Sequence, residues 1–268
     1  MSAQTIGALT RAAWYQARSY RLSMFMQVGG IILVALPTYF VAHALQPTMA
    51  GAIAAEAEQF FAFVLVGSVG LMLATAAMVT LQGTIAGGIS TGYFEALLMT
   101  RSPLSSILAG LTSYGLLLTA VRAAVLMAAG AVLGAQIVWG KTLPALLILA
   151  LLIATHWGVG LVAAALVIAF RTSGPVIQVM STVSVLFGGV YYPVSVIPSW
   201  LGVIAKATPL AYGLRAMRRV LLQGEGLNAV GPDLAILTVM AAVTLTVGAL
   251  SIRTALKYAR RVGTLGTY

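Results

Sequence analysis

The sequence has no cysteine and very little charge. The absence of cysteine from 268 residues excludes disulfide bonds and thiolate metal sites. Only 7% of the residues are charged, whereas 60% are hydrophobic, and the mean hydropathy is +1.01. A water-soluble protein of this size needs a far more charged surface to cover its core. We therefore expect an integral membrane protein and set aside a soluble helical one.

Acidic residues are especially scarce, with five against fifteen lysines and arginines and a net charge of +10. The basic residues are dispersed between apolar segments, so they do not form the single face that nucleic acid requires. They are better suited to anionic lipid head groups and to setting the orientation of a membrane protein. We expect membrane lipids as partners and no nucleic acid.

Side chains suited to catalysis or metal binding do not gather at any one expected depth. His43 and His156 are far apart and lack a carboxylate on the same segment. Residues 134–142 resemble a phosphate loop, but five residues separate the glycines where the loop requires four. The sequence therefore predicts no enzyme, metal site or cofactor on this chain.

Long apolar runs predict six membrane-spanning helices, because about 20 apolar residues cross the hydrocarbon core as a helix. The predicted spans are residues 22–45, 60–82, 107–135, 143–170, 176–192 and 233–256. The fifth is short and runs into Pro193, which suggests a re-entrant segment at its outer end. The fold class expected is a single all-α membrane domain over residues 1–268. Small residues four apart, such as Gly83 and Gly87, indicate close helix packing or a dimer contact.

The distribution of lysine and arginine predicts that both termini lie in the cytoplasm. Before the first span, residues 1–21 place Ile6, Leu9, Ala13 and Ala17 on one side of a helix, away from the arginines. This pattern is typical of an interfacial helix on the inner membrane surface.

Proline and glycine break residues 193–232 into short helical pieces between spans five and six. Trp200, Tyr212 and the cluster Arg215, Arg218 and Arg219 stand between the breaks, and the segment is too apolar for a free loop. Irregular backbone at membrane depth needs protein or a water-filled cavity around it. We therefore expect a re-entrant helical hairpin at the outer rim.

Arg122 is the only charge well inside a predicted span. A buried arginine is costly unless it finds partners, so it is a candidate for a cavity role in transport. Snorkelling toward the outer face, or hydrogen bonding to nearby carbonyls, is the alternative.

Residues 88–106 form a polar interruption between two apolar stretches and contain Glu95, the only acid expected on the cytoplasmic side. Thr91 to Thr100 reads T-G-Y-F-E-A-L-L-M-T and is followed by Ser102 and Pro103. This run resembles the G-T-L-E-x-L-L-x-T-P signature of permease subunits of ABC-2 type exporters. Later motifs resemble the same family in the same order: Gly188 to Pro193 (G-G-V-Y-Y-P), Ile197 to Leu201 (I-P-S-W-L), Pro209 to Tyr212 (P-L-A-Y) with Arg218, and the tail at residues 263–268.

The resemblance implies a homodimer of six-span subunits in the bacterial cytoplasmic membrane, with a separate nucleotide-binding subunit that carries ATP and Mg. The interfacial helix and a short cytoplasmic coupling helix would contact this ATPase. The residues expected at that contact are Tyr93, Phe94, Glu95 and Arg101. The residues expected to form the outer hairpin are Tyr192, Pro193, Pro198, Trp200, Pro209, Tyr212 and Arg218.

The substrate is less strongly indicated than the family. Sugar exporters tend to line their route with aromatic residues, but only 8% of this sequence is aromatic. We therefore favour an amphiphilic, lipid-like or drug-like cargo over a polysaccharide. A secondary transporter is disfavoured because every acid lies at a predicted span boundary rather than near the membrane midplane. A membrane assembly subunit without transport is a further alternative.

Overall fold

The computed structural model describes residues 2–172 and 174–262, and no β-strand occurs in them. The family-like tail at residues 263–268 lies outside the described residues. The long helices are α2 (Arg21–Ile53), α3 (Phe60–Ser90), α5 (Leu104–Val132), α6 (Thr142–Phe170) and α10 (Gly231–Val262). The shorter helices are α1 (Ser2–Arg18), α4 (Tyr93–Leu98), α7 (Gly174–Phe187), α8 (Gly202–Ala207) and α9 (Pro209–Leu221), with 3₁₀ turns at Trp139–Lys141 and Val194–Val196.

Five helices in the described part of the chain are long and apolar enough to cross a membrane. The expected fifth span, residues 176–192, instead contains α7, which has 14 residues and ends at Phe187. A helix of that length rises about 21 Å, whereas a hydrocarbon core is about 30 Å thick. Gly188 and Gly189 end the helix, and Gly189 has a positive φ of 73°. The six-span arrangement therefore stays a prediction.

α2 and α3 extend furthest beyond the apolar runs that predicted them, and α10 also continues past residue 256 to Val262. α2 continues to Ile53 rather than residue 45 and contains Pro37 and Pro47, which membrane helices tolerate better than soluble ones. α3 continues to Ser90 rather than residue 82, because residues 83–89 remain free of charge. The coupling region is consequently shorter than the interval 88–106.

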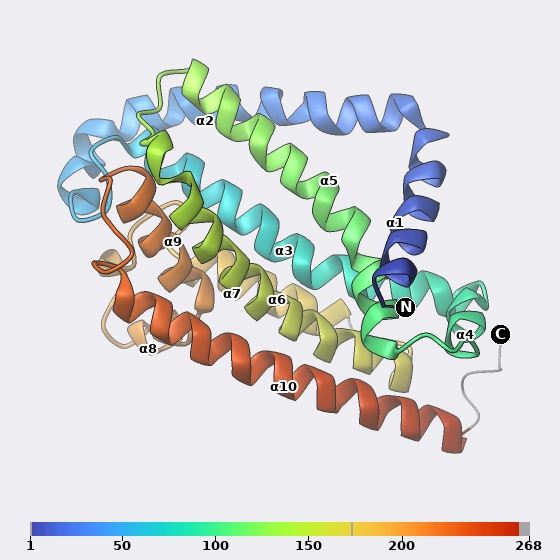
Figure 1. Ribbon diagram of the computed structural model, residues 1–268. Coiled ribbons are helices and arrows are strands. Elements are labelled where there is room, and N and C mark those ends of the chain that lie inside the picture. Colours follow the sequence, from blue (N-terminus) through green and yellow to red (C-terminus); the bar gives the residue numbers. More distant parts are fainter. Residues whose placement is uncertain (1, 173, 263–268) are drawn as a thin grey trace.

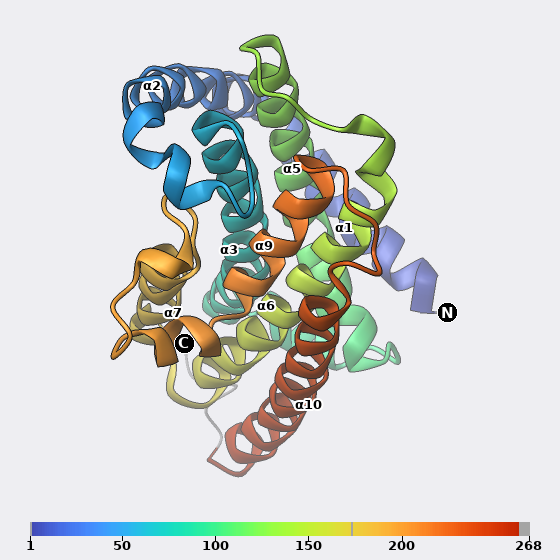
Figure 2. The same cartoon turned by 90° about the vertical axis from the view of Figure 1, so that its left-hand side faces the viewer.

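α3 is the central helix of the bundle, and most of its residues are buried. It packs against α2, α5, α6 and α9, while α6 also packs along α10 (Figure 2). The buried residues form three apolar clusters. One joins α2, α3 and α5, one joins α3, α6 and α9, and one joins the ends of α3, α6 and α10. These clusters connect the two ends of the molecule.

The irregular segments gather at opposite ends of the long helices. α4, the start of α5 and the end of α10 lie at one end, at the right of Figure 1. α8, α9 and the connection between α2 and α3 lie at the other end (Figure 1). α1 is steeply inclined to α3 and α10, because the chain turns sharply before α2 (Figure 1). The two candidate sites are thus separated by the length of the bundle.

Candidate functional site

The first candidate site is α4 and its surroundings, which we call the coupling end. Gly92 has a φ of 71°, a left-handed conformation that suits glycine and reverses the chain after α3. Phe94 is 1% exposed and packs on Gly88, where a Cβ atom would lie 3.1 Å from the Cβ atom of Phe94. Phe94 also belongs to the apolar cluster that joins α3, α6 and α10. This side chain therefore anchors α4 to the bundle.

The exposed side of α4 is built from other residues. Tyr93 is 45% exposed, Met99 is 88% exposed, and Arg101 is exposed in the following loop. Glu95 is half-buried, and its Oε1 has no hydrogen-bond partner among the described residues. Phe94 points into the protein, whereas Tyr93 and Arg101 are exposed at its surface and Glu95 is half-buried, with its Oε1 atom buried. The sequence did not predict that Met99 belongs to this surface, because an apolar side chain is not expected to be exposed.

α1 is attached to the same end of the molecule. A Cβ atom at Gly110 of α5 would lie 2.6 Å from Leu9 Cδ1, so the two helices are in close contact there. The rings of Trp14 and Tyr114 meet edge to face at 6.4 Å, and the hydroxyls of Thr5 and Ser102 are hydrogen-bonded at 3.1 Å. α1 and the α4–α5 connection therefore form one packed unit.

The second candidate site is the outer hairpin, and Arg218 of α9 is at its centre. Its side chain is 1% exposed, and Nη1 donates a hydrogen bond to Glu56 Oε2 at 3.0 Å. Nε and Nη2 donate to the carbonyl oxygens of Phe63 and Val190, both at 3.1 Å. The guanidinium carbon also lies 3.3 Å from the centre of the Phe63 ring. Arg218 thereby joins α9 to the α2–α3 connection, the start of α3 and the segment after α7.

The space around Arg218 is tightly filled. A Cβ atom at Gly67 would lie 2.5 Å from the Val190 carbonyl oxygen and 2.7 Å from Arg218 Nη2. Burial lowers the pKa of Arg218 to about 10, and the negative charge of Glu56 opposes this shift. The guanidinium is therefore still protonated at neutral pH and acts as a permanent buried cation.

Two further ion pairs hold the hairpin. Arg215 forms a bidentate pair with Asp233 in the first turn of α10, and the hydrogen bond to this carboxylate raises the pKa of Arg215. Arg219 Nε lies 2.7 Å from Glu225 Oε2, and both side chains are partly exposed. Each arginine of the cluster expected from the sequence thus has an acidic partner.

The structure also locates the other hairpin residues that the sequence predicted. The hydroxyl of Tyr192 donates to the carbonyl oxygen of Leu186, and that of Tyr212 donates to the carbonyl oxygen of Lys206 at 2.9 Å. Pro209 is the first residue of α9, a favourable place for proline. Pro193 is buried, while Pro198 and Trp200 are exposed, Trp200 to 76%. Arg218 contacts Val190, two residues before Tyr192, whereas Trp200 is exposed at the surface.

One side-chain nitrogen of Arg122 lacks a hydrogen-bond partner within the described residues. It is half-buried in α5, and its Nε is buried without a hydrogen-bond partner among the described residues. It lies ten residues before the end of α5, which corresponds to a rise of about 15 Å. That position is deep within the helix, as expected from the sequence.

We expect Arg122→Leu to raise the melting temperature of the detergent-solubilised protein. Removing a charge from a spanning helix saves about 2 to 3 kcal/mol, and no described contact of Nε is lost. Thermal unfolding, followed by circular dichroism, measures the change. A lower melting temperature would mean that Arg122 makes stabilising contacts outside the single chain.

Among residues 2–172 and 174–262, no three histidine, aspartate or glutamate side chains lie close enough together to hold a metal ion.

The chain is a multi-pass helical membrane protein. The described ion pairs lie at one end of it, and the short helix α4 lies at the other. Residues 4–222 match the family model of the ABC-2 type transporter, so the chain belongs to that family. The match extends from α1 through α9 and includes the coupling end and the three arginines of the outer hairpin, but not Glu225 and Asp233. No curated protein sequence matches the chain.

The family defines the chain as the membrane component of an ABC transporter. Such a component takes part in transport without being a catalyst itself, and the family generally works with an ABC ATPase.

Proposed function

We propose that this chain is the permease subunit of an ATP-driven exporter in the bacterial cytoplasmic membrane. A separate nucleotide-binding subunit supplies ATP and Mg, and a second copy of the chain completes the translocation path. The five long apolar helices cross the membrane, α7 and the segment after it make the sixth crossing, and both termini face the cytoplasm. The cargo is an amphiphilic, lipid-like or drug-like molecule that moves outward.

The observation that carries this proposal is the construction of the coupling end. An exposed face with Tyr93 and Arg101 is fixed to the bundle by the buried ring of Phe94. Phe94 contacts the cluster that includes the ends of α3, α6 and α10. Because packed interiors transmit displacement, a push on α4 moves these helices rather than bending a loop. α1 adds a second attached surface for the ATPase.

An apolar pocket that opens at the surface supports an apolar cargo over a sugar. A cavity of about 340 Å³ lies between α3, α5, α6 and α9, and its walls include Leu73, Met127 and Leu149. Most of its lining side chains are aliphatic. Apolar walls favour the burial of apolar ligand surface, whereas sugar rings would require flat aromatic faces and several hydrogen-bonding groups.

The coupling role is tested by Glu95→Arg in vesicles that contain the permease and its ATPase. Charge reversal at a subunit contact costs several kcal/mol, so we expect export to fall at least about tenfold per ATP hydrolysed. Glu95→Gln, which keeps the shape of the side chain, should retain more activity. Glu58→Arg is the matched control, because Glu58 is an exposed acid at the opposite end of the chain.

Unchanged export by Glu95→Arg would contradict the role of this surface, provided that the variant still forms the complex. The cargo is addressed separately by mass spectrometry of molecules that co-purify with the transporter. Stimulation of the ATPase by an amphiphile supports the proposed substrate class. Export of a glycan in the same vesicles would replace it with the polysaccharide alternative.

A further inference from the structure

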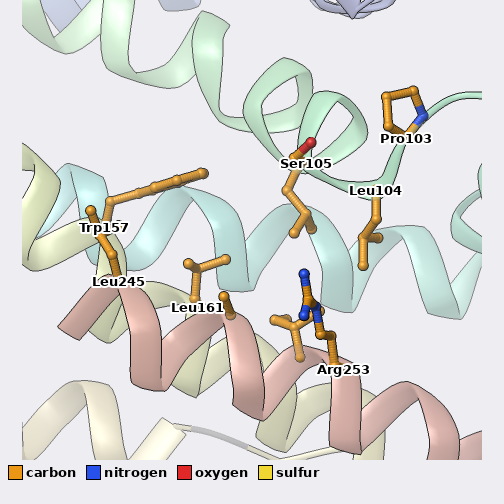
Figure 3. A pocket seen from close by; sticks show the side chains of 10 residues that line it. Pro103, Leu104, Ser105, Trp157, Leu161, Leu245 and Arg253 are labelled. Atoms are coloured by element: carbon orange, nitrogen blue, oxygen red, sulfur yellow. The ribbon is translucent and has the colours of Figure 1, made fainter. Parts of the chain in front are cut away.

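A groove lies between α5, α6 and α10 and adjoins the coupling end at the start of α5. Its volume is about 470 Å³, and it is lined mainly by aliphatic residues with Trp157 at one end (Figure 3). Leu104 and Ser105 approach it from the start of α5, and Leu161 and Leu245 form part of its floor (Figure 3). Arg253 extends from α10 into the space between these walls (Figure 3).

Arg253 brings a positive charge to the groove without a counter-ion. It makes no ion pair or hydrogen bond within the described part of the chain. Glu56, Glu225 and Asp233 are paired with other arginines at the opposite end. The nearby start of α5 adds partial positive charge from its first amide groups. The mouth of the groove is therefore electropositive, while its walls are apolar.

The position of Arg253 along α10 matches the boundary of a hydrocarbon core. Residues 234–252, between Asp233 and Arg253, carry no charge, and as a helix they rise about 28 Å. A hydrocarbon core is about 30 Å thick. Asp233 and Arg253 thus mark the two head-group levels. From Arg253 to Leu245 the groove continues inward by about 12 Å along α10, which is within the acyl region of one leaflet.

We propose that this groove is a binding site for an anionic phospholipid of the leaflet that contains the end of α10. The lipid phosphate pairs with Arg253, and an acyl chain lies against Leu161, Leu245 and the ring of Trp157. The inference rests on the proposed placement of the membrane and not on ATP coupling or export.

The site can be tested by quenching of Trp157 fluorescence with brominated lipids. Trp14, Trp139 and Trp200 are 46%, 56% and 76% exposed, so replacing all three with Phe leaves Trp157 as the only tryptophan of the full chain. The protein is reconstituted in phosphatidylcholine vesicles with increasing brominated phosphatidylglycerol or brominated phosphatidylcholine. We expect an apparent preference of about fivefold for the anionic lipid, from one basic residue near the surface.

Arg253→Leu should abolish this preference, whereas Arg253→Lys should keep most of it. Arg261→Leu is the matched control, because Arg261 is an exposed arginine on α10 that does not line the groove. Ala249→Phe fills the groove from α10 and should reduce quenching by both lipids. Circular dichroism confirms that each variant is folded.

Three outcomes would overturn the proposal. Equal quenching by the two lipids would mean that charge is not recognised. Loss of the preference in Arg261→Leu to the same extent as in Arg253→Leu would assign it to the general positive charge of the chain. Absence of quenching by either lipid would mean that a second copy or another protein covers the groove. None of these results depends on an ATPase, so they leave the proposed exporter function untouched.

Discussion

Arg218→Leu is expected to lower the free energy of unfolding by about 3 to 5 kcal/mol, the usual effect of breaking a buried ion pair. The substitution removes the donors to Glu56 and to the carbonyl oxygens of Phe63 and Val190. Because Glu56 is only 9% exposed, its carboxylate would remain in a poorly solvated place without its cation. Thermal or denaturant unfolding of the detergent-solubilised protein measures the loss.

Arg219→Leu is the matched control one residue along the same helix. Its partner Glu225 and Arg219 itself are each 29% exposed at the side chain, so we expect a change within about 1 kcal/mol. The double variant Arg218→Leu with Glu56→Leu should recover much of the lost stability, because both buried charges are then absent. Equal effects of Arg218→Leu and Arg219→Leu would show that burial of the pair is not what stabilises the hairpin.

The Arg218 contacts also have a consequence for motion within the bundle. They connect α9 with the start of α3 and with the segment after α7, and α3 reaches the coupling end near Gly88 and Phe94. The outer hairpin is therefore attached to the same helix on which α4 packs. In the proposed exporter, a displacement at the coupling end would reach the outer rim through α3.

Hydropathy predicted the long helices closely where apolar runs begin or end at polar residues. The expected start of the second span at residue 60 coincides with the start of α3, and the expected end of the fourth at residue 170 coincides with the end of α6. It was less accurate at α2 and α7. Proline and glycine do not have a fixed effect within membrane helices, since neighbouring helices can satisfy the freed backbone groups.

The outer site was only partly predictable. The ordered motifs singled out Arg218, but its partner Glu56 is 162 residues away in the chain and has no recognisable motif of its own. A pairing between residues so distant depends on how helices pack, which a single sequence does not reveal. At the coupling end, the sequence grouped Phe94 with Tyr93 and Glu95. Only the structure shows that Phe94 is an internal anchor and that Met99 is exposed.

Four-residue glycine spacing predicted close packing at Gly130, where a Cβ atom would lie 2.2 Å from Leu65 Cδ2, but not at every such pair. Gly83 and Gly87 have the four-residue spacing typical of close contacts, yet no atom of another element lies within 4 Å of a Cβ atom placed at either one. One backbone-to-backbone approach lies between α6 and α10. A Cβ atom at Gly158 would lie 2.5 Å from the backbone carbon of Thr244, and one at Gly248 would lie 2.7 Å from the carbonyl oxygen of Gly158.

Gly158→Ala is accordingly expected to destabilise the protein by about 1 to 3 kcal/mol, and Gly158→Leu by more. Two of the obstructing atoms, the carbonyl carbon of Thr244 and the amide nitrogen of Leu245, belong to the backbone of α10. A new rotamer of Thr244 therefore cannot make enough room, and the two helices must move apart. Such a shift would open the apolar contact along much of their length and move Arg253 relative to α5. Unfolding in detergent measures the stability, and brominated-lipid quenching of Trp157 reports the altered groove.

Gly51→Ala in α2 is the control, because a Cβ atom there meets nothing within 4 Å. Alanine favours a helix over glycine by up to about 1 kcal/mol, so this variant should be unchanged or slightly more stable. Both variants replace glycine with alanine within a helix. Opposite signs of their stability changes would therefore separate steric conflict from helix propensity. If Gly158→Ala were as stable as Gly51→Ala, α6 and α10 would be farther apart in the membrane than their backbone contact indicates. The groove between them and α5 would then have a different shape.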